Sequence, residues 1–329
     1  MAKSSIIQIF KLIRFKNLLI VALVQYLMRW CIIYPILHLK GLELQYSEFN
    51  FFLLVFSTLC ITAGGYVIND YFDLRTDALN KPDELVVGTS IKRRTAMALH
   101  TVLNIAGVLM GIYLSWRMGI LKFGIVFVLI TGLLWFYSTS FKRKFLAGNL
   151  IIALLTALVP LIVLLFEIPA LKSAYGQELI FYESDIKNLW FMIAGFTFFA
   201  FLITFIREII KDTEDIEGDI QDNRNTMPVI IGIKATTIIS IIFCIGMIAS
   251  IIYVYFAYLK NLWYLLDDYF TPVYLLVLVI LPLVFLIYKL IRAKDKKDFH
   301  FASSLLKFII VTGVLYAVVF WYVANIQNF

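Results

Sequence analysis

Nine long apolar runs divide this sequence, and they constrain its fold more than any other feature. A helix that crosses a bilayer needs about 20 mostly apolar residues, and each run is close to that length. The runs cover residues 17–38, 49–68, 95–115, 121–139, 147–166, 188–206, 235–259, 271–291 and 303–324. Because backbone polar groups in lipid must be satisfied internally, we expect an all-α polytopic membrane protein with about nine transmembrane helices.

The composition supports this expectation. Hydrophobic residues make up 62% of the chain and charged residues only 16%, whereas soluble domains carry about 25% charged residues. A soluble enzyme, a disordered protein and a nucleic-acid binder are therefore excluded. No soluble stretch interrupts the apolar runs, so we expect a single intramembrane domain over residues 1–329 that contacts the lipid bilayer and no nucleic acid.

The distribution of basic residues predicts the orientation of the chain. The net charge is +7, and most of the 29 Lys and Arg residues fall in inner segments if the N-terminus lies inside. Excess positive charge on cytoplasmic loops is typical of membrane proteins. The first apolar run is full length and follows basic residues without a small-residue cleavage site, which argues against a signal peptide. We therefore predict a multi-pass protein of a bacterial inner (plasma) membrane, with the N-terminus in the cytoplasm.

Two acidic stretches mark a candidate site on the cytoplasmic side. More than half of the 22 acidic residues lie within residues 70–84 and 208–222, each at the inner end of a predicted span. Carboxylates at that depth are costly and indicate function. In both stretches three aspartates stand at i, i+3 and i+7, and in the second a glutamate precedes them by one turn. These residues are Asp70, Asp73 and Asp77, and Glu208, Asp212, Asp215 and Asp219.

This repeated spacing predicts a magnesium site. On a helix each set falls on one face, where unneutralised carboxylates repel one another. Mg²⁺ takes oxygen ligands and is typically held by a few carboxylates together with substrate phosphates. We therefore assign all seven carboxylates as metal ligands, and Asp70, Asp73, Asp212 and Asp215 also as catalytic residues. If Gly218 ends the helix, Asp219 would join from a loop.

Basic residues near the acidic stretches are candidates for binding a diphosphate. Lys211 is embedded in the second acidic segment, and Lys142 closes a short loop after Tyr137. Both could meet diphosphate oxygens as point charges. We assign Lys211 to catalysis, and Lys142 and Arg75 to substrate binding.

At these residues the chain resembles the UbiA-type intramembrane prenyltransferases. The family motif N-D-x-x-D-x-x-x-D is complete, a second acidic motif matches, and shorter segments resemble Y-S-x-x-x-K and an N-terminal R-P-x-N in which Phe15 replaces the proline. The matching residues are Asn69, Asp70, Asp73 and Asp77; Glu208, Asp212, Asp215 and Asp219; Tyr137, Ser138 and Lys142; and Arg14 and Asn17.

The resemblance implies a fold and an activity. Members of the family are helical bundles around a central cavity, and they transfer a prenyl group from a prenyl diphosphate donor to a lipophilic acceptor with Mg²⁺ as cofactor. By this resemblance the first acidic motif holds the Mg²⁺–diphosphate, and the second motif faces it. The resemblance also implies that Arg14, Asn17, Asn69 and Tyr137 bind substrate.

Two segments favour one acceptor. The run from Arg207 to Asp219 and the phrase from Lys81 to Gly88 resemble the digeranylgeranylglyceryl phosphate synthase subgroup. These enzymes transfer geranylgeranyl to a hydroxyl of geranylgeranylglyceryl phosphate in ether-lipid synthesis. Glu84 departs from the pattern, because many members carry a basic residue there.

Two alternatives stay open at this point. An aromatic acceptor such as 4-hydroxybenzoate, a quinone precursor, would suit the same donor site. A cation-coupled transporter is more distant, because transporters place their sites near the bilayer midplane on broken helices. Here the carboxylates stand at the inner ends of the predicted spans.

Overall fold

The computed structural model describes residues 2–80, 85–262, 265 and 268–326. Within these residues the chain is α-helical and contains no β-strand. It divides into two compact units. The first comprises Met1–Leu23, Tyr46–Ile151 and Asp215–Val229, and the second comprises Val24–Gln45, Ile152–Glu214 and Ile230–Phe329. The single prenyltransferase domain over 1–329 stays a prediction, as does the central cavity.

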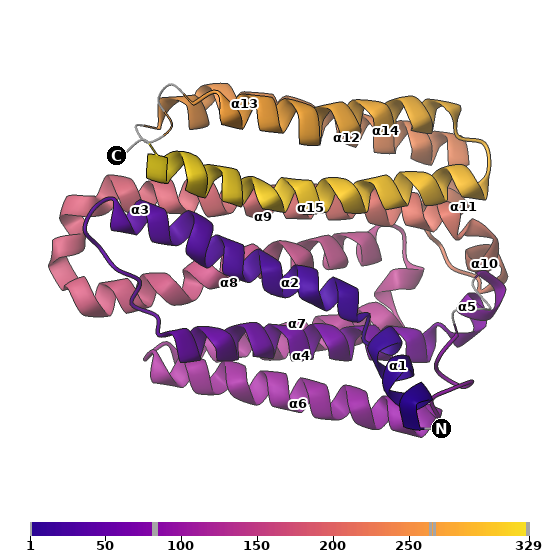
Figure 1. Ribbon diagram of the computed structural model, residues 1–329. Helices are drawn as coiled ribbons and strands as arrows, with labels where there is room; N and C mark the ends of the chain where they lie inside the picture. Colours follow the sequence, from indigo (N-terminus) through magenta and orange to yellow (C-terminus); the bar gives the residue numbers. More distant parts are fainter. Residues whose placement is uncertain (1, 81–84, 263–264, 266–267, 327–329) are drawn as a thin grey trace. The chain divides into compact units, whose positions relative to one another are not determined.

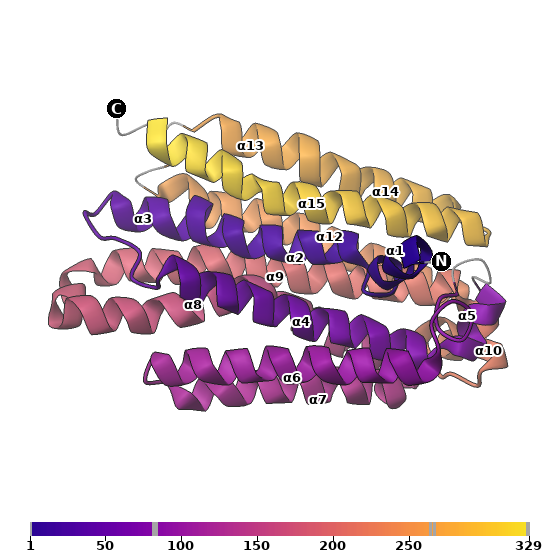
Figure 2. The same ribbon diagram turned by 60° about the horizontal axis from the view of Figure 1, so that its bottom comes forward.

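The first unit is built around three long helices. These helices, α4, α6 and α7, run side by side (Figures 1 and 2). Shorter helices complete the unit, and three helices continue from it into the second unit. The long helices are α4 (Glu48–Phe72), α6 (Arg93–Arg117) and α7 (Gly124–Thr139); the short ones are α1 (Ala2–Leu12), α5 (Leu74–Asn80) and α10 (Ile216–Gln221); the shared ones are α2 (Phe15–Leu27), α8 (Ala147–Tyr175) and α11 (Met227–Ile231).

Small residues allow α4 and α6 to approach closely. Ser57 of α4 donates a hydrogen bond from its hydroxyl to the carbonyl oxygen of Gly107 on α6, at 2.7 Å. A Cβ atom at Gly107 would lie 2.6 Å from the Ile61 side chain and 3.0 Å from the Ser57 carbonyl oxygen. Close backbone contact through small residues is how helices associate in lipid, where the hydrophobic effect does not drive them together.

The second unit packs around α9 and α15. Helix α15 (Lys296–Ile326) lies against α9 (Glu183–Glu214) and α14 (Leu281–Arg292), and α9 also contacts α12 (Ile233–Ala257). Their shared core includes fully buried Ile206, Cys244, Leu283 and Leu306. The remaining elements are the π-helix Met28–Ile33, α3 (Tyr34–His38), the 3₁₀-helices Gly176–Tyr182 and Leu259–Asn261, α13 (Phe270–Leu275) and the π-helix Leu276–Ile280.

Both π-helical segments immediately precede a proline-containing turn. Met28–Ile33 is followed by Pro35, and Leu276–Ile280 by Pro282. A proline inside a helix cannot donate the i→i−4 hydrogen bond and clashes with the preceding turn. A π-bulge is one way for a helix to accommodate that disruption without ending.

The helices confirm the predicted membrane-protein fold. The described residues contain eight helical stretches that are long and apolar enough to cross a membrane. One of them, Ala147–Glu214, holds both α8 and α9, so the nine predicted spans are all present. Many large apolar side chains on these helices are exposed, for example Val102, Leu109 and Ile125. Lipid-facing surfaces of this kind are expected of helices in a bilayer.

Candidate functional site

The first acidic motif spans the junction of α4 and α5. Asn69 and Asp70 lie in the last turn of α4, Asp73 is the C-cap residue, and Asp77 lies in α5. The backbone nearly continues the helix, because the Asp73 N–H donates to the Asn69 carbonyl at 2.9 Å and the Asp77 N–H to the Asp73 carbonyl at 2.8 Å. The helix on which the three aspartates would share one face is thus interrupted at one residue, the middle aspartate.

The second acidic motif is interrupted at the corresponding place. Glu208, Lys211 and Asp212 lie on α9 in the second unit, where Arg207 pairs with Glu208 at 2.8 Å. Helix α9 ends at Glu214, and Asp215 is the N-cap residue of α10, which carries Asp219. The condition that Gly218 ends the helix is not met, because the break falls three residues earlier and Gly218 is buried within α10.

Helices α5 and α10 contact each other within the first unit and lie at the same end of it (Figures 1 and 2). Asn80 of α5 donates a side-chain hydrogen bond to the Asp215 carbonyl oxygen at 3.2 Å. A Cβ atom at Gly218 would lie 2.4 Å from the Asn80 amide nitrogen. Glycine at this position therefore lets the middle of the second motif come close to the end of the first.

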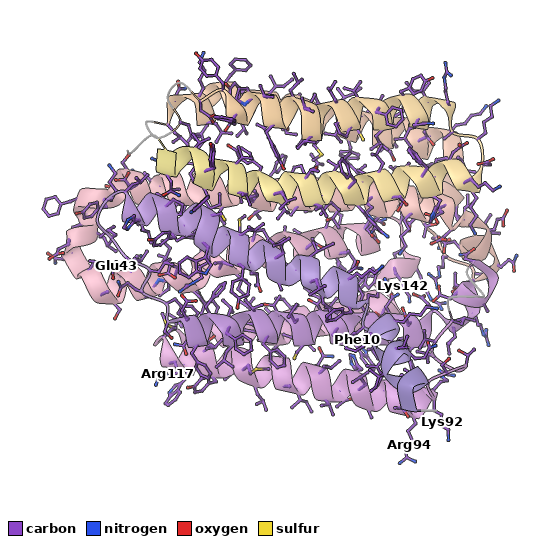
Figure 3. The ribbon with its side chains drawn as sticks, in the orientation of Figure 1. Phe10, Glu43, Lys92, Arg94, Arg117 and Lys142 are labelled. Atoms are coloured by element: carbon purple, nitrogen blue, oxygen red, sulfur yellow. The ribbon has the colours of Figure 1, made fainter. Side chains whose placement is uncertain are left out.

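Two buried cations meet at one oxygen of Asp73. Asp73 Oδ1 accepts a hydrogen bond from Lys142 Nζ and another, at 2.7 Å, from Arg224 Nη2. All three residues are less than one-tenth exposed. Lys142 lies in the 3₁₀-helix Phe141–Arg143 between α7 and α8, and Figure 3 places it toward the same end of the unit as Lys92 and Arg94.

Arg224 connects Asp73 to the second acidic motif. Its Nε donates to Asp222 Oδ2 at 2.9 Å, and its Nη1 lies 3.8 Å from Asp219 Oδ1. The Thr226 hydroxyl donates to Asp219 Oδ2 at 3.0 Å. The preceding residue, Asn223, has φ +51°, a left-handed conformation that asparagine tolerates better than most residues. This turn aims the guanidinium back toward α5.

Burial and the neighbouring charges act differently on the pKa values of Asp73 and Asp219. Burial alone would raise the pKa of Asp73, but the Lys142 ammonium and the Arg224 guanidinium outweigh it and hold that pKa below its ordinary value. Burial raises the pKa of Asp219 to about 6, against the opposing effect of the Arg224 charge. Asp73 is thus held as a carboxylate, whereas Asp219 takes up a proton more easily.

Arg14 supplies a separate cation to the first motif. Its Nη2 lies 2.8 Å from Asp70 Oδ1, and its guanidinium stacks over the Tyr66 ring at 4.9 Å from the centroid. Asn17 donates to the Tyr66 hydroxyl at 3.4 Å. Arg14 has φ +50° at the break between α1 and α2. Leu12, fully buried beside Val67 of α4, anchors this break.

The remaining assigned residues differ in placement. Tyr137 lies beside Lys142, since a Cβ atom at Gly148 would stand 3.2 Å from the Tyr137 ring and 2.8 Å from Lys142 Cα. Arg75 is exposed on α5. The segment from Lys81 to Gly88, in which Glu84 departs from the subgroup pattern, begins with residues 81–84, and these lie outside the described ranges.

Sequence reasoning did not select Arg224 or its polar neighbours. Thr76 donates to Asp222 at 3.0 Å, and it also accepts from Arg224. Thr76 stands at i+3 from Asp73, and Asp222 at i+3 from Asp219 and i+7 from Asp215, so helical spacing is the signal that could have found these two residues. Arg224 could be noticed only as one of several basic residues near the acidic stretches.

The donor set suits a hard cation that is completed by substrate. No three acidic, histidine or cysteine side chains among the described residues gather closely enough to hold a metal ion by themselves. Mg²⁺ does not require such a cage, because it typically uses one or two carboxylates plus phosphate oxygens and water. The side-chain oxygen of Asn69 is buried and has no hydrogen-bond partner within the described part of the chain. An all-oxygen set with such an atom fits Mg²⁺.

Comparison with known proteins assigns the family. The model of the UbiA prenyltransferase family matches residues 42–311. Digeranylgeranylglyceryl phosphate synthase of Methanosphaera stadtmanae is 30% identical over 263 residues, which cover 77% of this chain and 82% of that protein. The synthase of the same name from Sulfurisphaera tokodaii is 33% identical over 224 residues, covering 67% of this chain and 71% of the relative.

Solved structures show the same fold. A digeranylgeranylglyceryl phosphate synthase structure matches with a TM-score of 0.61 and 21% identity, covering 97% of this chain and 99% of the other. A UbiA homologue from Archaeoglobus fulgidus, bound to DMAPP and Mg²⁺, matches with a TM-score of 0.52 and 14% identity over 93% of this chain and 98% of the other. This chain is an integral membrane prenyltransferase that belongs to the UbiA prenyltransferase family.

Proposed function

We propose that this protein transfers a geranylgeranyl group from geranylgeranyl diphosphate to a hydroxyl of geranylgeranylglyceryl phosphate, in a reaction that depends on Mg²⁺. The observation that carries the proposal is the cluster at Asp73, where carboxylates of both acidic motifs and buried cations come together. Relatives named digeranylgeranylglyceryl phosphate synthase, of which this chain covers most of the length, support the acceptor.

The residues have distinct roles in this proposal. Asp70, Asp73, Asp77, Asp215 and Asp219 are the proposed metal ligands of the first unit, and the spacing of the second motif adds Glu208 and Asp212. When bound, Mg²⁺ neutralises negative charge on the departing diphosphate. Its presence in a UbiA homologue that also holds DMAPP supports this role.

Basic and polar side chains hold the diphosphate in place. Lys142 and Arg14 donate to its oxygens, where negative charge grows as the allylic carbon–oxygen bond breaks. Lys211 on α9 and Arg75 on α5 are further proposed phosphate-binding residues. Asn17, Asn69 and Tyr137 line the donor site, and Asn17 keeps the Tyr66 hydroxyl in position. The hydroxyl acceptor loses its proton to a carboxylate or to the released diphosphate.

The orientation belongs to the proposal as well. In the first unit Lys92 and Arg94 lie at one end of α6 and Arg117 at the other (Figure 3). The end with Lys92 and Arg94 also holds Lys142 and Arg143, and a concentration of positive charge favours the cytoplasm. We place the N-terminus and the site on the cytoplasmic side of the plasma membrane. The bacterial source stays a prediction, since the two relatives named above are archaeal.

A transfer assay tests the proposal. Purified protein in detergent is incubated with radiolabelled geranylgeranyl diphosphate and Mg²⁺, with geranylgeranylglyceryl phosphate in one tube and 4-hydroxybenzoate in another. We expect a labelled product only in the first tube and none after EDTA treatment. A product only in the second tube would replace the acceptor by an aromatic ring. The cation-coupled transporter is left without support by the family assignment.

A further inference from the structure

We propose that Arg224 is a resident counter-ion that joins the two acidic motifs while no metal is bound, and that it exchanges onto the donor's diphosphate when Mg²⁺ takes its place. This inference rests on the proposed function and adds a second state to the same site. Arg224 lies outside both motifs and is selected only by its contacts.

The contacts of Arg224 reach both motifs at once. Its guanidinium donates to Asp73 at 2.7 Å, to Asp222 at 2.9 Å, and lies 3.8 Å from Asp219. Asp73 caps α4, whereas Asp219 lies on α10. The planar guanidinium spreads five N–H donors over three nitrogen atoms and so reaches carboxylates on different sides, whereas a lysine ammonium carries its three donors on one atom. Arg224 therefore does what a bridging metal would do between the same carboxylates.

Basic side chains already occupy several carboxylates of the cluster within the first unit. Four carboxylates lie within ion-pair distance of four basic side chains. The carboxylates are Asp70, Asp73, Asp219 and Asp222, and the basic residues are Arg14, Lys142, Arg143 and Arg224. A Mg²⁺ ion bound to Asp73 or Asp219 would lie beside the Arg224 guanidinium, which already contacts both carboxylates. Like charges at such short range in a buried site repel strongly, so a resident cation must move as Mg²⁺ arrives.

Arg224 is built to move without leaving the site. Its Nε is held by Asp222, which also accepts a hydrogen bond from Thr76. The terminal nitrogens, which contact Asp73 and Asp219, can then swing about this fixed point. Guanidinium groups bind phosphate in a bidentate way, and a diphosphate brings the negative charge that compensates for the arriving Mg²⁺. The guanidinium thus exchanges one set of anionic oxygens for another.

Two binding measurements with opposite signs test this exchange. In the first, isothermal titration calorimetry measures the affinity of the metal-free protein for Mg²⁺ alone. Loss of Arg224 removes the competitor for Asp73 and Asp219, so Arg224→Gln should bind Mg²⁺ about tenfold more tightly than wild type. In the second, the non-hydrolysable geranylgeranyl thiodiphosphate is titrated at saturating Mg²⁺. Here Arg224→Gln should bind about tenfold more weakly, because the phosphate partner is lost.

The chain offers a matched control. Arg143 contacts Asp222 at 3.5 Å from a side chain that is half exposed. Arg143→Gln removes the same charge from the same cluster, and its effect on either affinity should stay below about threefold, as expected for a partly exposed ion pair. Arg224→Lys keeps the charge but cannot bridge, so it should shift both affinities in the same directions as Arg224→Gln, by smaller factors.

The outcomes that would overturn the proposed exchange of Arg224 are as specific as those that support it. Unchanged or weaker Mg²⁺ binding by Arg224→Gln, or unchanged binding of the thiodiphosphate, overturns the exchange. If Arg224→Gln does not fold, Arg224→Lys carries the test, and wild-type affinities in that variant overturn the proposal. Failure of the wild-type protein to bind the thiodiphosphate with Mg²⁺ would instead contradict the proposed function itself. Neither measurement depends on turnover.

Discussion

At the scale of single residues, one carboxylate oxygen of Asp73 accepts hydrogen bonds from two buried cationic side chains. Lys142 and Arg224 both donate to Oδ1, and their positive charges hold the pKa of Asp73 below its ordinary value against the effect of burial. The pairing keeps the carboxylate ionised, which is the form that the proposed metal binding requires. The charge of Asp73 matters more than its shape, and an isosteric amide tests this.

Asp73→Asn should lower the rate of geranylgeranyl transfer by about 10²-fold or more, because the amide is a poor metal ligand and no longer balances Lys142 and Arg224. Steady-state transfer assays measure the change. Glu214→Gln is the matched control, since buried Glu214 pairs at 2.8 Å with the exposed His300 of α15. That variant should stay within about threefold of wild type. Equal losses in the two variants would contradict the role of Asp73.

At the scale of elements, the bundle depends on where small residues and polar pairs lie on its helices. In the first unit Gly107 brings α6 against α4, and Gly111 leaves room for Phe127 of α7. In the second unit Arg29 of the π-helix forms a fully buried ion pair with Glu167 of α8 at 3.0 Å. The other Glu167 oxygen accepts the Gln45 backbone N–H at 2.6 Å, so this pair also holds the segment that follows α3.

Gly107→Ala should destabilise the protein by about 1–3 kcal/mol, because the added methyl group overpacks the α4–α6 contact. Gly132 on α7 provides the comparison, since a Cβ atom there meets nothing within 4 Å. Gly132→Ala should be neutral or stabilise by about 0.5–1 kcal/mol through its higher helix propensity. Unfolding of both variants in detergent measures the difference, and a larger loss for Gly132→Ala would refute this account of the packing.

Glu167→Gln should cost about 3–5 kcal/mol, because it removes one charge of a fully buried ion pair. Glu183→Gln makes the same chemical change in the Lys187–Glu183 pair, where both side chains are about two-thirds exposed. Its cost should be much smaller, because water screens an exposed ion pair. The two free energies of unfolding are compared in one detergent, and similar values would show that burial of the Arg29 pair contributes nothing.

At the scale of the whole molecule, the distribution of charge along the chain sets its orientation in the membrane. Lys92 and Arg94 precede or begin α6, and Arg117 ends it. Figure 3 shows these residues at opposite ends of the helix. The end with more basic residues is favoured on the cytoplasmic side, so the proposed site is expected to face the cytoplasm.

Cysteine accessibility tests this orientation. In a background without Cys31, Cys60 and Cys244, the variant Arg117→Cys should react with a membrane-impermeant thiol reagent in intact cells. Arg94→Cys should react only after the cells are permeabilised. The two positions lie on one helix, so the comparison does not depend on packing elsewhere. The reverse pattern would place the site on the outer face.

The sequence alone determined the elements and the family. Apolar length predicts a spanning helix from local composition, because the bilayer requires internally satisfied backbone over a fixed thickness. All nine predicted spans are present in the described chain, with ends shifted by several residues in places such as α8 and α9. The spacing of the acidic motifs is likewise a local signal, and the resemblance drawn from it agrees with the family found by comparison.

Only the tertiary structure decided which charges meet. Lys142 and Arg224 are 69 and 151 residues from Asp73 in the chain, and no periodicity links positions so far apart. Their meeting depends on how α4, α5, α10 and the turn after α7 pack, and on Gly148 and Gly218 allowing close approach. The helix break at Asp215 is likewise accompanied by a contact distant in sequence, since the Asn80 side chain donates to the Asp215 carbonyl oxygen. Local patterns specify the elements, whereas the pairing of buried charges is a property of the packed chain.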